Sequence, residues 1–362
     1  MFRKTFYGLI CCLLAVSMAS PGVLASSGPE STDVFVGGHD GYPIYRIPAM
    51  VVSNKGTVLA FCEGRKTGIF DHGNIDLVLK RSFDNGKTWG PLQVIQSEGF
   101  KTWGNPAPVV DRKTGRIWLP FCLDNNRVFV VYSDDDGKTW SERREITDDV
   151  KRAGWGWYAT GPGHSIQLSS GRLLVPCDHG TATGMASHVI YSDDHGKTWK
   201  LGGVLEKGTD ESMALETADG RVYLTMRNIY PGKRRAYAWS DNGGGDWTPV
   251  EIEEELIGPT CQASILRFTK EVEHDRDRVL FLNPASEDRE NMAVRISYDE
   301  AKTWSRPRTL YAGPAAYSDM AVLPDLTVGA LYERGRLWPY RRIVFTRMEI
   351  DWISRNKDKI SK

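Results

Sequence analysis

The sequence predicts an all-β protein, a six-bladed β-propeller, from a repeated motif and from the strand-like run that precedes each copy of it. The motif follows the pattern Ser-x-Asp-x-Gly-x-Thr-Trp. Three copies fit it closely, at 82–89, 133–140 and 192–199, and two are weaker, at 240–247 and 297–304. The copies start 48 to 59 residues apart. A period near fifty residues is typical of propellers and solenoids.

Each motif has the composition of a β-hairpin tip. Serine and aspartate side chains bond the amide groups of a turn, and glycine adopts the positive φ that many turns need. The closing tryptophan is large and apolar enough to wedge between neighbouring sheets. We therefore interpret the motif as architectural and expect no chemistry from it.

Other strands are expected where short apolar runs rich in β-branched residues are bounded by turn residues. These runs lie at 34–36, 57–62, 75–79, 117–122, 127–132, 173–176, 188–191, 221–226, 279–282, 321–323, 328–332 and 342–347. The only segment whose sequence pattern allows a helix is the one near the C-terminus. Five motifs, with strands at both ends of the chain, allow six blades if the first and last strands share one blade.

The first 25 residues have the pattern of a secretory signal peptide. Arg3 and Lys4 precede an apolar run that ends near a small residue, Ala25, as export signals do. The run is too short for a membrane span. We therefore expect a signal peptide at 1–25, a single catalytic domain at 26–362, and a secreted or periplasmic protein without an integral membrane span.

The distribution of charge argues against nucleic acid as a partner. The chain of 362 residues has 46 basic and 46 acidic residues, and no basic stripe that would indicate nucleic-acid binding.

Of the six cysteines, four lie beyond the signal, at Cys62, Cys122, Cys177 and Cys261. Their wide spacing does not fit a disulfide framework or a zinc site, so we expect buried thiols, although export keeps a disulfide open. No metal or other cofactor is expected.

Arginines within apolar strands are the first candidates for a binding site. Arg46 lies in an apolar run between two prolines, and Arg227 follows the apolar run 221–226. A buried arginine needs an anionic partner, which is either a structural salt bridge or a bound carboxylate held by the guanidinium fork. Trp155 and Trp157 are expected at a pocket rim. Asp71, on a loop, is by itself a weak candidate.

Taken together, these features resemble the sialidase family. The resemblance covers nearly all of residues 34–353 and is carried by Tyr45-Arg46-Ile47-Pro48, the repeated motifs and three arginines in matching contexts. It implies a six-bladed propeller that hydrolyses terminal sialic acids of sialylated glycans, glycoproteins or glycolipids. The implied site consists of the arginine triad Arg46, Arg227 and Arg289, the pocket arginine Arg65, the acid/base Asp71, the nucleophile Tyr317 with its partner Glu211, and Glu333, the carboxylate that braces Arg46.

The sequence departs from the family pattern at several positions. The usual Asn-Glu-Cys-Gln run is Asp210-Glu211-Ser212-Met213, and Glu290 replaces a second arginine. The fourth motif has Asn242 for aspartate and the fifth has Ala301 for glycine. Because the implied catalytic positions are retained, these changes bear on substrate range more than on activity.

The residue types suit the chemistry of a sialoside, whose carboxylate sits on its anomeric carbon. Three arginines can neutralise that carboxylate, and a neutral tyrosine avoids the repulsion that an anionic nucleophile would meet. Residues from Arg46 to Glu333 can meet because propeller blades surround one channel. Two alternatives stay open: a trans-sialidase with the same chemistry and another acceptor, and a non-catalytic sialic-acid-binding lectin.

Overall fold

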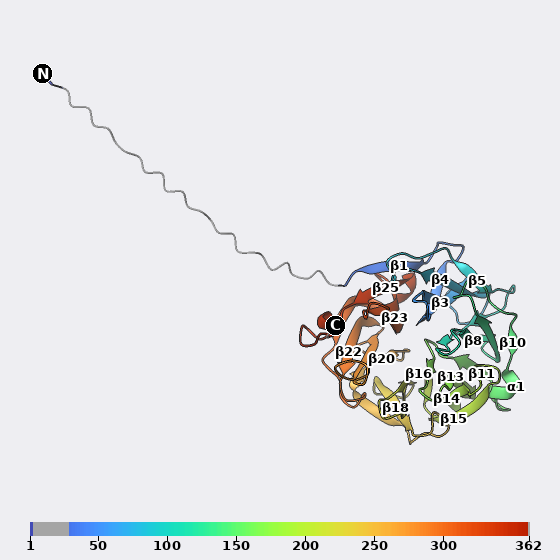
Figure 1. The fold of residues 1–362 in the computed structure, drawn as a ribbon. Helices are drawn as coiled ribbons and strands as arrows, with labels where there is room; N and C mark the ends of the chain where they lie inside the picture. Colours follow the sequence, from blue (N-terminus) through green and yellow to red (C-terminus); the bar gives the residue numbers. More distant parts are fainter. Residues whose placement is uncertain (3–28, 361–362) are drawn as a thin grey trace.

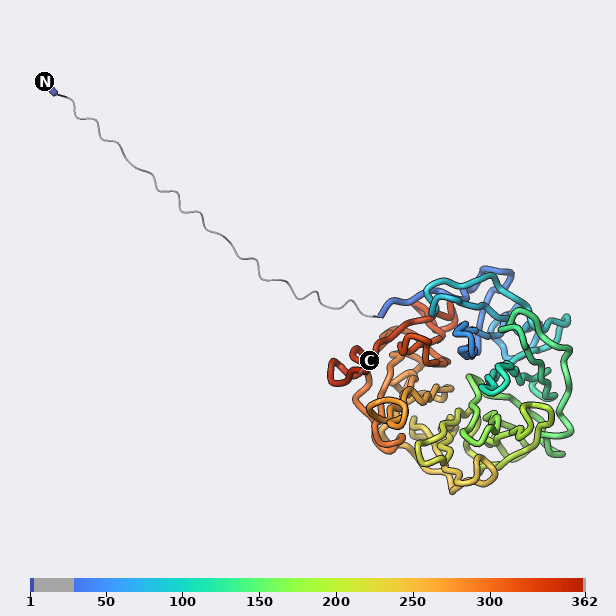
Figure 2. The backbone as a smooth tube through the Cα atoms, in the orientation of Figure 1, coloured from blue at the N-terminus to red at the C-terminus, as the bar shows by residue number. Residues whose placement is uncertain are grey.

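The computed structural model describes residues 1–2 and 29–360, and these form β-sheets arranged in a ring (Figure 1). The chain passes once around the ring in sequence order (Figure 2). Helical structure in the described residues is confined to α1 (Thr147–Val150), α2 (Ile350–Ile353) and the 3₁₀ turn η1 (Pro339–Arg341). The prediction of an all-β propeller is therefore confirmed. The expected signal peptide lies almost wholly outside the described residues.

Four of the sheets each have four or five antiparallel strands. One contains β2 (Ile44–Val52), β3 (Val58–Arg65), β4 (Ile75–Ser82) and β5 (Gln93–Gln96). The next contains β6 (Trp103–Gly104), β7 (Val109–Val110), β8 (Ile117–Leu123), β9 (Arg127–Ser133) and β10 (Arg144–Glu145). A third contains β11 (Trp157–Thr160), β12 (Ile166–Gln167), β13 (Leu173–Thr181), β14 (Gly184–Ser192) and β15 (Lys200–Lys207). The fourth contains β16 (Thr209–Glu216), β17 (Val222–Asn228), β18 (Arg234–Ser240) and β19 (Glu251–Ile257).

The remaining sheet has seven strands and joins the two ends of the described chain. Its members are β20 (Ser264–Thr269), β21 (Arg278–Pro284), β22 (Glu290–Ser297), β23 (Arg308–Val322), β24 (Val328–Arg334), β25 (Arg342–Met348) and β1 (Ser31–Val36). The N-terminal strand β1 pairs antiparallel with the C-terminal strand β25, from Ser31 opposite Thr346 to Val36 opposite Arg342. The first and last strands therefore share one sheet, which the expectation of a shared blade requires.

The core lies between neighbouring sheets. Leu59 and Phe61 of β3, for example, share a buried cluster with Ile117 and Leu119 of β8. The four cysteines of the described chain, Cys62, Cys122, Cys177 and Cys261, are buried and unpaired, in agreement with the prediction of buried thiols. Among residues 29–360, none of the helices has the length and apolar character that a membrane span requires.

Each motif begins at the end of one strand, leads to the next strand of the same sheet, and repeats one set of hydrogen bonds. In the first copy, the Ser82 hydroxyl donates to Asp84 at 2.8 Å and accepts from the Gly86 N–H at 2.8 Å. Asp84 also accepts from the Thr88 N–H at 2.9 Å. The closing Trp89 packs its ring against Phe345 of the adjoining sheet, with centroids 5.3 Å apart. The architectural interpretation of the motif is confirmed here.

One strand differs from its prediction in a way that matters for the site. The sequence placed Tyr317 before a short strand at 321–323, whereas it lies inside β23, which runs from Arg308 to Val322. The prediction was wrong because glycine and proline at 313–314 resemble a loop. In the structure the strand continues through them and changes partner, from β22 before Ala315 to β24 from Ala315 onward.

Candidate active site

The sequence-predicted site residues gather at the end of the strands opposite the repeated motifs. Strand β4 shows the geometry: the loop that carries Asp71 precedes Ile75 at one end, and the motif begins at Ser82 at the other. Arg65, Arg227 and Glu333 occupy the equivalent end of their strands. Residues far apart in the sequence therefore line one end of the ring.

Arg46 is held by a buried carboxylate. Its Nε donates to Glu333 Oε1 at 2.9 Å, and the Ile47 N–H donates to the same oxygen at 2.9 Å. Ile47 has φ of +61°, which is rare for a β-branched residue, and the pairing of β2 with β3 shifts register between Arg46 and Ala49. Such bulges redirect side chains beside functional sites. Here the irregularity brings both the guanidinium and a backbone donor to Glu333.

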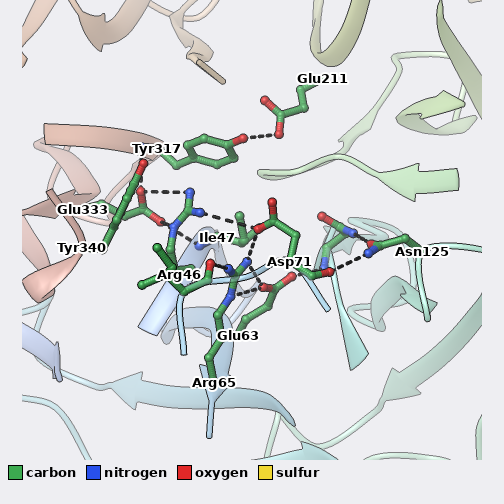
Figure 3. A network of polar contacts seen from close by, with 12 residues as sticks. Arg46, Ile47, Glu63, Arg65, Asp71, Asn125, Glu211, Tyr317, Glu333 and Tyr340 are labelled. Atoms are coloured by element: carbon green, nitrogen blue, oxygen red, sulfur yellow. Dashed lines mark hydrogen bonds and ion pairs between the residues drawn. The ribbon is translucent and has the colours of Figure 1, made fainter. Parts of the chain in front are cut away.

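Tyr317 lies above this arginine with its hydroxyl pointing at Glu211 (Figure 3). The phenol donates a hydrogen bond to Glu211 Oε1, and Arg227 Nη1 donates to the phenol oxygen at 3.1 Å. Burial raises the pKa of Tyr317, the nearby Glu211 raises it further, and the arginines oppose both effects. Burial also raises the pKa of Glu211, against the opposing charge of Arg227. Both shifts favour the protonated forms, in line with a phenol that donates its hydrogen to Glu211.

Asp71 lies beside Arg46 and Arg65 (Figure 3). Its carboxylate is 63% exposed, accepts a hydrogen bond from Arg65 Nη2 at 2.7 Å and lies 3.6 Å from Arg46 Nη1. Partial burial raises its pKa, but Arg65 and Arg46 outweigh that effect and lower it. Asp71 is therefore ionised at neutral pH.

Two residues that the sequence did not single out hold Asp71 in place. Glu63 accepts hydrogen bonds from Arg65 at 2.9 and 2.6 Å and keeps that arginine extended. The Asn125 side chain donates to the Asp71 backbone carbonyl at 2.8 Å. Glu63 had a weak signal, since it is a charged residue that directly follows the apolar run 58–62 of its strand. Asn125 had none.

Arg227 has two carboxylate partners. Its Nε donates to Asp210 at 2.7 Å, and its Nη1 lies 2.9 Å from Glu211 Oε2. Asp210 is buried, and the sequence identified it only as a departure from the family pattern. Its position next to Glu211 on β16, with an arginine ending the neighbouring strand, was the signal that could have identified it.

Arg289 has neutral partners. Its Nη2 donates to the Thr260 carbonyl at 2.9 Å, and its Nη1 donates to the Tyr340 hydroxyl at 2.5 Å. Its guanidinium carbon lies 5.4 Å from the centre of the Tyr317 ring. The structure thus brings all three predicted arginines to Tyr317, from β2, from β17 and from the segment that precedes β22. Tyr340 was not identified from the sequence.

The two tryptophans expected at the rim have different positions. Trp157 is 37% exposed and lines a cavity of about 680 Å³ together with Asp71 and Asn125. Trp155 is buried, with its ring stacked on His179 at 3.6 Å between centroids. The rim prediction was therefore wrong for Trp155, because the chain turns its side chain into the sheet interface.

Comparisons with known proteins identify the family. A family described as "BNR repeat-like domain" matches residues 56–332. An exo-alpha-sialidase of Aspergillus fumigatus is 31% identical over 90% of this chain and 88% of its own length. The chain belongs to the sialidase family of glycoside hydrolases. A sialidase of Micromonospora viridifaciens is 35% identical over 84% of this chain, which spans 52% of that relative's length. The solved structure of the Hadza microbial sialidase Hz136 has a TM-score of 0.82 and 28% identity, and covers 89% of this chain and 68% of its own.

The match to the repeat family does not include all of the predicted site residues. Arg65, Asp71, Glu211, Arg227, Arg289 and Tyr317 lie within residues 56–332, whereas Arg46 and Glu333 lie outside them. The contact between Arg46 and Glu333 spans 287 residues of sequence. Closure of the ring through the pairing of β1 with β25 brings these two ends of the chain together.

Proposed function

We propose that the chain is an exo-α-sialidase that hydrolyses terminal α-linked sialic acids from glycoconjugates, with retention through a tyrosyl-enzyme intermediate. The observation that carries the proposal is the Tyr317 hydroxyl, which donates to Glu211 and accepts from Arg227 at 3.1 Å. A phenol that is hydrogen-bonded to a carboxylate and to an arginine is placed to act as a nucleophile once the carboxylate takes its proton.

The three arginines supply the carboxylate receptor of this proposal. Arg46 and Arg289 lie 4.9 and 5.4 Å from the centre of the Tyr317 ring, and Arg227 touches its hydroxyl. Guanidinium groups bind carboxylates through paired, charge-assisted hydrogen bonds. A sialic acid carboxylate held there would place the adjacent anomeric carbon near the Tyr317 oxygen.

In the first half-reaction, Glu211 takes the phenolic proton while the Tyr317 oxygen attacks the anomeric carbon. The bond from that carbon to the leaving oxygen breaks, and Asp71 gives this oxygen a proton. In the free protein Arg65 and Arg46 lower the pKa of Asp71 and keep it ionised, so Asp71 must gain a proton before this step. Because the substrate carboxylate offsets the charge of the arginines, its binding raises the Asp71 pKa toward the protonated form.

In the second half-reaction, Asp71 removes a proton from water, and the water oxygen attacks the anomeric carbon. The bond from carbon to the Tyr317 oxygen breaks, and Glu211 returns the proton to the phenolate. Two successive displacements at one carbon give overall retention.

The first test measures release of the fluorophore from a 4-methylumbelliferyl α-sialoside by the wild type and by Tyr317→Phe. The expected result is turnover by the wild type and its loss in a variant with unchanged thermal unfolding. No turnover by the folded wild type would support the lectin alternative instead. Analysis of the products separates hydrolysis, which gives free sialic acid, from transfer, which gives an anhydro or acceptor-linked product.

The covalent intermediate has its own test. A fluorinated sialosyl fluoride slows the second half-reaction, so the glycosyl adduct should accumulate on the peptide that contains Tyr317, as measured by mass spectrometry. An adduct on a carboxylate peptide would refute the tyrosine nucleophile. Proton NMR of the first-formed product, before mutarotation, checks retention.

We also propose that the ring has six blades within one catalytic domain at 26–362. In support, β23 pairs with β22 through its first part and with β24 through its second, so that the seven-stranded sheet divides into two units. A cavity of about 640 Å³ is lined by residues of six strands, β2, β7, β12, β16, β20 and β23. An experimental structure in which these six strands surround one axis checks the proposal, and one with a continuous seven-stranded blade would refute it.

Export through a signal peptide at 1–25 is proposed from the sequence pattern alone. Expression in a bacterial or eukaryotic secretion host, followed by N-terminal sequencing of the exported protein, should show a mature chain that starts at Ser26. An intact N-terminus on a protein retained inside the cells would contradict this proposal.

A further inference from the structure

The three arginines of the proposed carboxylate receptor are not equally neutralised by the protein. Arg46 donates to Glu333 at 2.9 Å, and Arg227 donates to Asp210 at 2.7 Å and lies 2.9 Å from Glu211. Arg289 forms no salt bridge with any carboxylate of the described residues, and it contacts the Thr260 carbonyl and the Tyr340 hydroxyl. Arg289 therefore has the positive charge that is most available to a bound anion.

The same difference leaves Arg289 the least constrained of the three. A buried carboxylate fixes an arginine through two charge-assisted bonds, whereas a carbonyl and a hydroxyl each fix one nitrogen. Long side chains lose considerable rotamer entropy when a ligand orders them, so an arginine that is already ordered binds its ligand more tightly. The orientation of Arg289 before binding depends on these two neutral contacts.

Tyr340 touches two of the three arginines at once. Its hydroxyl accepts from Arg289 Nη1 at 2.5 Å, and the face of its ring lies 4.1 Å from the guanidinium carbon of Arg46. It lies in η1, between β24 and β25, beside Arg46 and Glu333 (Figure 3). Trp338 packs edge-on against its ring, with centroids 5.3 Å apart. The Tyr340 ring is thus supported by Trp338, and Tyr340 contacts Arg46 and Arg289 of the receptor.

We propose that Tyr340 is a positioning residue of the carboxylate receptor. Its hydroxyl fixes Arg289 and its ring fixes Arg46, so that both guanidinium groups face the anion before it arrives. The proposal rests on the proposed function, since it assumes that these arginines bind the sialic acid carboxylate. It predicts an effect on ligands that carry a free carboxylate and none on ligands that lack it.

The experiment compares binding of a 2,3-unsaturated sialic acid with binding of its methyl ester, measured by calorimetry. Loss of a hydrogen bond to a charged group typically weakens binding by about tenfold. We expect Tyr340→Phe to weaken binding of the acid by this factor and to leave binding of the ester unchanged. Tyr340→Leu also removes the ring from Arg46, so its loss for the acid should be larger.

Tyr311→Phe is the matched control. The Tyr311 hydroxyl donates to the Gly335 carbonyl at 2.7 Å, so this variant also removes a tyrosine hydroxyl that supports the segment between β24 and β25. The Tyr311 side chain makes no contact with the three arginines in the described structure. The ratio of acid to ester affinity of Tyr311→Phe should therefore equal that of the wild type.

The outcomes separate this proposal from the proposed function. A wild type that does not prefer the acid over its ester would overturn the carboxylate receptor, and with it both proposals. If the wild type prefers the acid and Tyr340→Phe keeps the full preference, only the role of Tyr340 is overturned. Equal weakening of acid and ester in Tyr340→Phe would also overturn it, because a general structural effect does not depend on the carboxylate.

Discussion

The two ends of the strands are built from different kinds of contact. At one end, each motif is closed by bonds between residues two to four positions apart, such as Ser82 with Asp84 and Gly86. At the other end, Arg46 meets Glu333 across 287 positions, and Tyr317 meets Glu211 across 106. The motif end repeats one set of local hydrogen bonds in each copy. The opposite end is formed once, by residues that come from all around the ring.

This difference separates stability from chemistry. The motif residues bond to their own turn and pack their tryptophans between sheets, so changes there should alter folding. The pocket residues carry mutually compensating charges around one tyrosine, so changes there should alter activity. A motif variant that alters activity without altering folding, or a pocket variant that alters folding without altering activity, would contradict this separation.

The largest effect is expected from Glu211→Gln in the pocket. The amide cannot take the Tyr317 proton, and loss of a general base typically lowers the rate by about 10²- to 10⁴-fold. Steady-state kinetics with a fluorogenic sialoside measures this. Glu216→Gln is the control, because Glu216 lies on the same strand, β16, and accepts from Ser169 outside the site. A large loss in the control would show that β16 tolerates no such change and would undo the comparison.

The next effect belongs to the motif end. Gly196 has φ of +84°, and a Cβ there would lie 2.1 Å from the Trp118 ring. Gly196→Ala therefore combines backbone strain with overpacking, which together cost roughly 2–4 kcal/mol of unfolding free energy. Gly171→Ala, with φ of +93° and open space around it, should show only the strain, about 1 kcal/mol. Urea unfolding measures both, and equal losses would refute the packing contribution.

Acidification should destabilise the motif end, but only at pH values well below neutral. Bonds from Thr88 lower the pKa of Asp84 to about 2. In Asp135 and Asp194, partial burial opposes the shift, and bonds from the motif threonines and serines still lower each pKa to about 2. Because these pKa values are lower in the folded state, their stabilisation is fully present above about pH 4 and is lost as pH falls toward 2.

The variant Asp84→Asn/Asp135→Asn/Asp194→Asn sharpens this prediction. The fourth motif already uses Asn242, which accepts from the Gly245 and Asp246 N–H groups at 2.9 Å and does not titrate. The triple variant should lose less unfolding free energy than the wild type between pH 4 and 2, as measured by urea unfolding. Equal losses would place the acid sensitivity elsewhere.

The smallest effect is expected from Ala301→Gly in the fifth motif. Ala301 has φ of +64°, where the other motifs have glycine. Glycine relieves a strain of about 1 kcal/mol, partly offset by the entropy it adds to the unfolded chain. The net gain in unfolding free energy should be below about 1 kcal/mol, and thermal unfolding measures it. A clear destabilisation would mean that packing of the buried methyl group outweighs the strain.

The sequence predicted the two ends unequally well. The motif contacts were predictable from residue types alone, because serine, aspartate, glycine and threonine at fixed spacing bond to one another. The pocket residues were named through their resemblance to the sialidase family, and the structure brings Arg46, Arg227, Arg289 and Glu211 around Tyr317. The strand that carries Tyr317 was predicted too short, since Gly313 and Pro314 do not interrupt it.

The sequence by itself determined the all-β propeller class and the position of every motif, because those features depend on contacts within a few residues. It also limited the chemistry to residue types suited to a carboxylate-bearing sugar. The resemblance named Glu333 as the partner of Arg46, and only the tertiary structure decided the other partners: the Asp210 carboxylate for Arg227 and a neutral tyrosine hydroxyl for Arg289. Charge compensation depends on distance in space, and that distance is set only when the ring of sheets is closed.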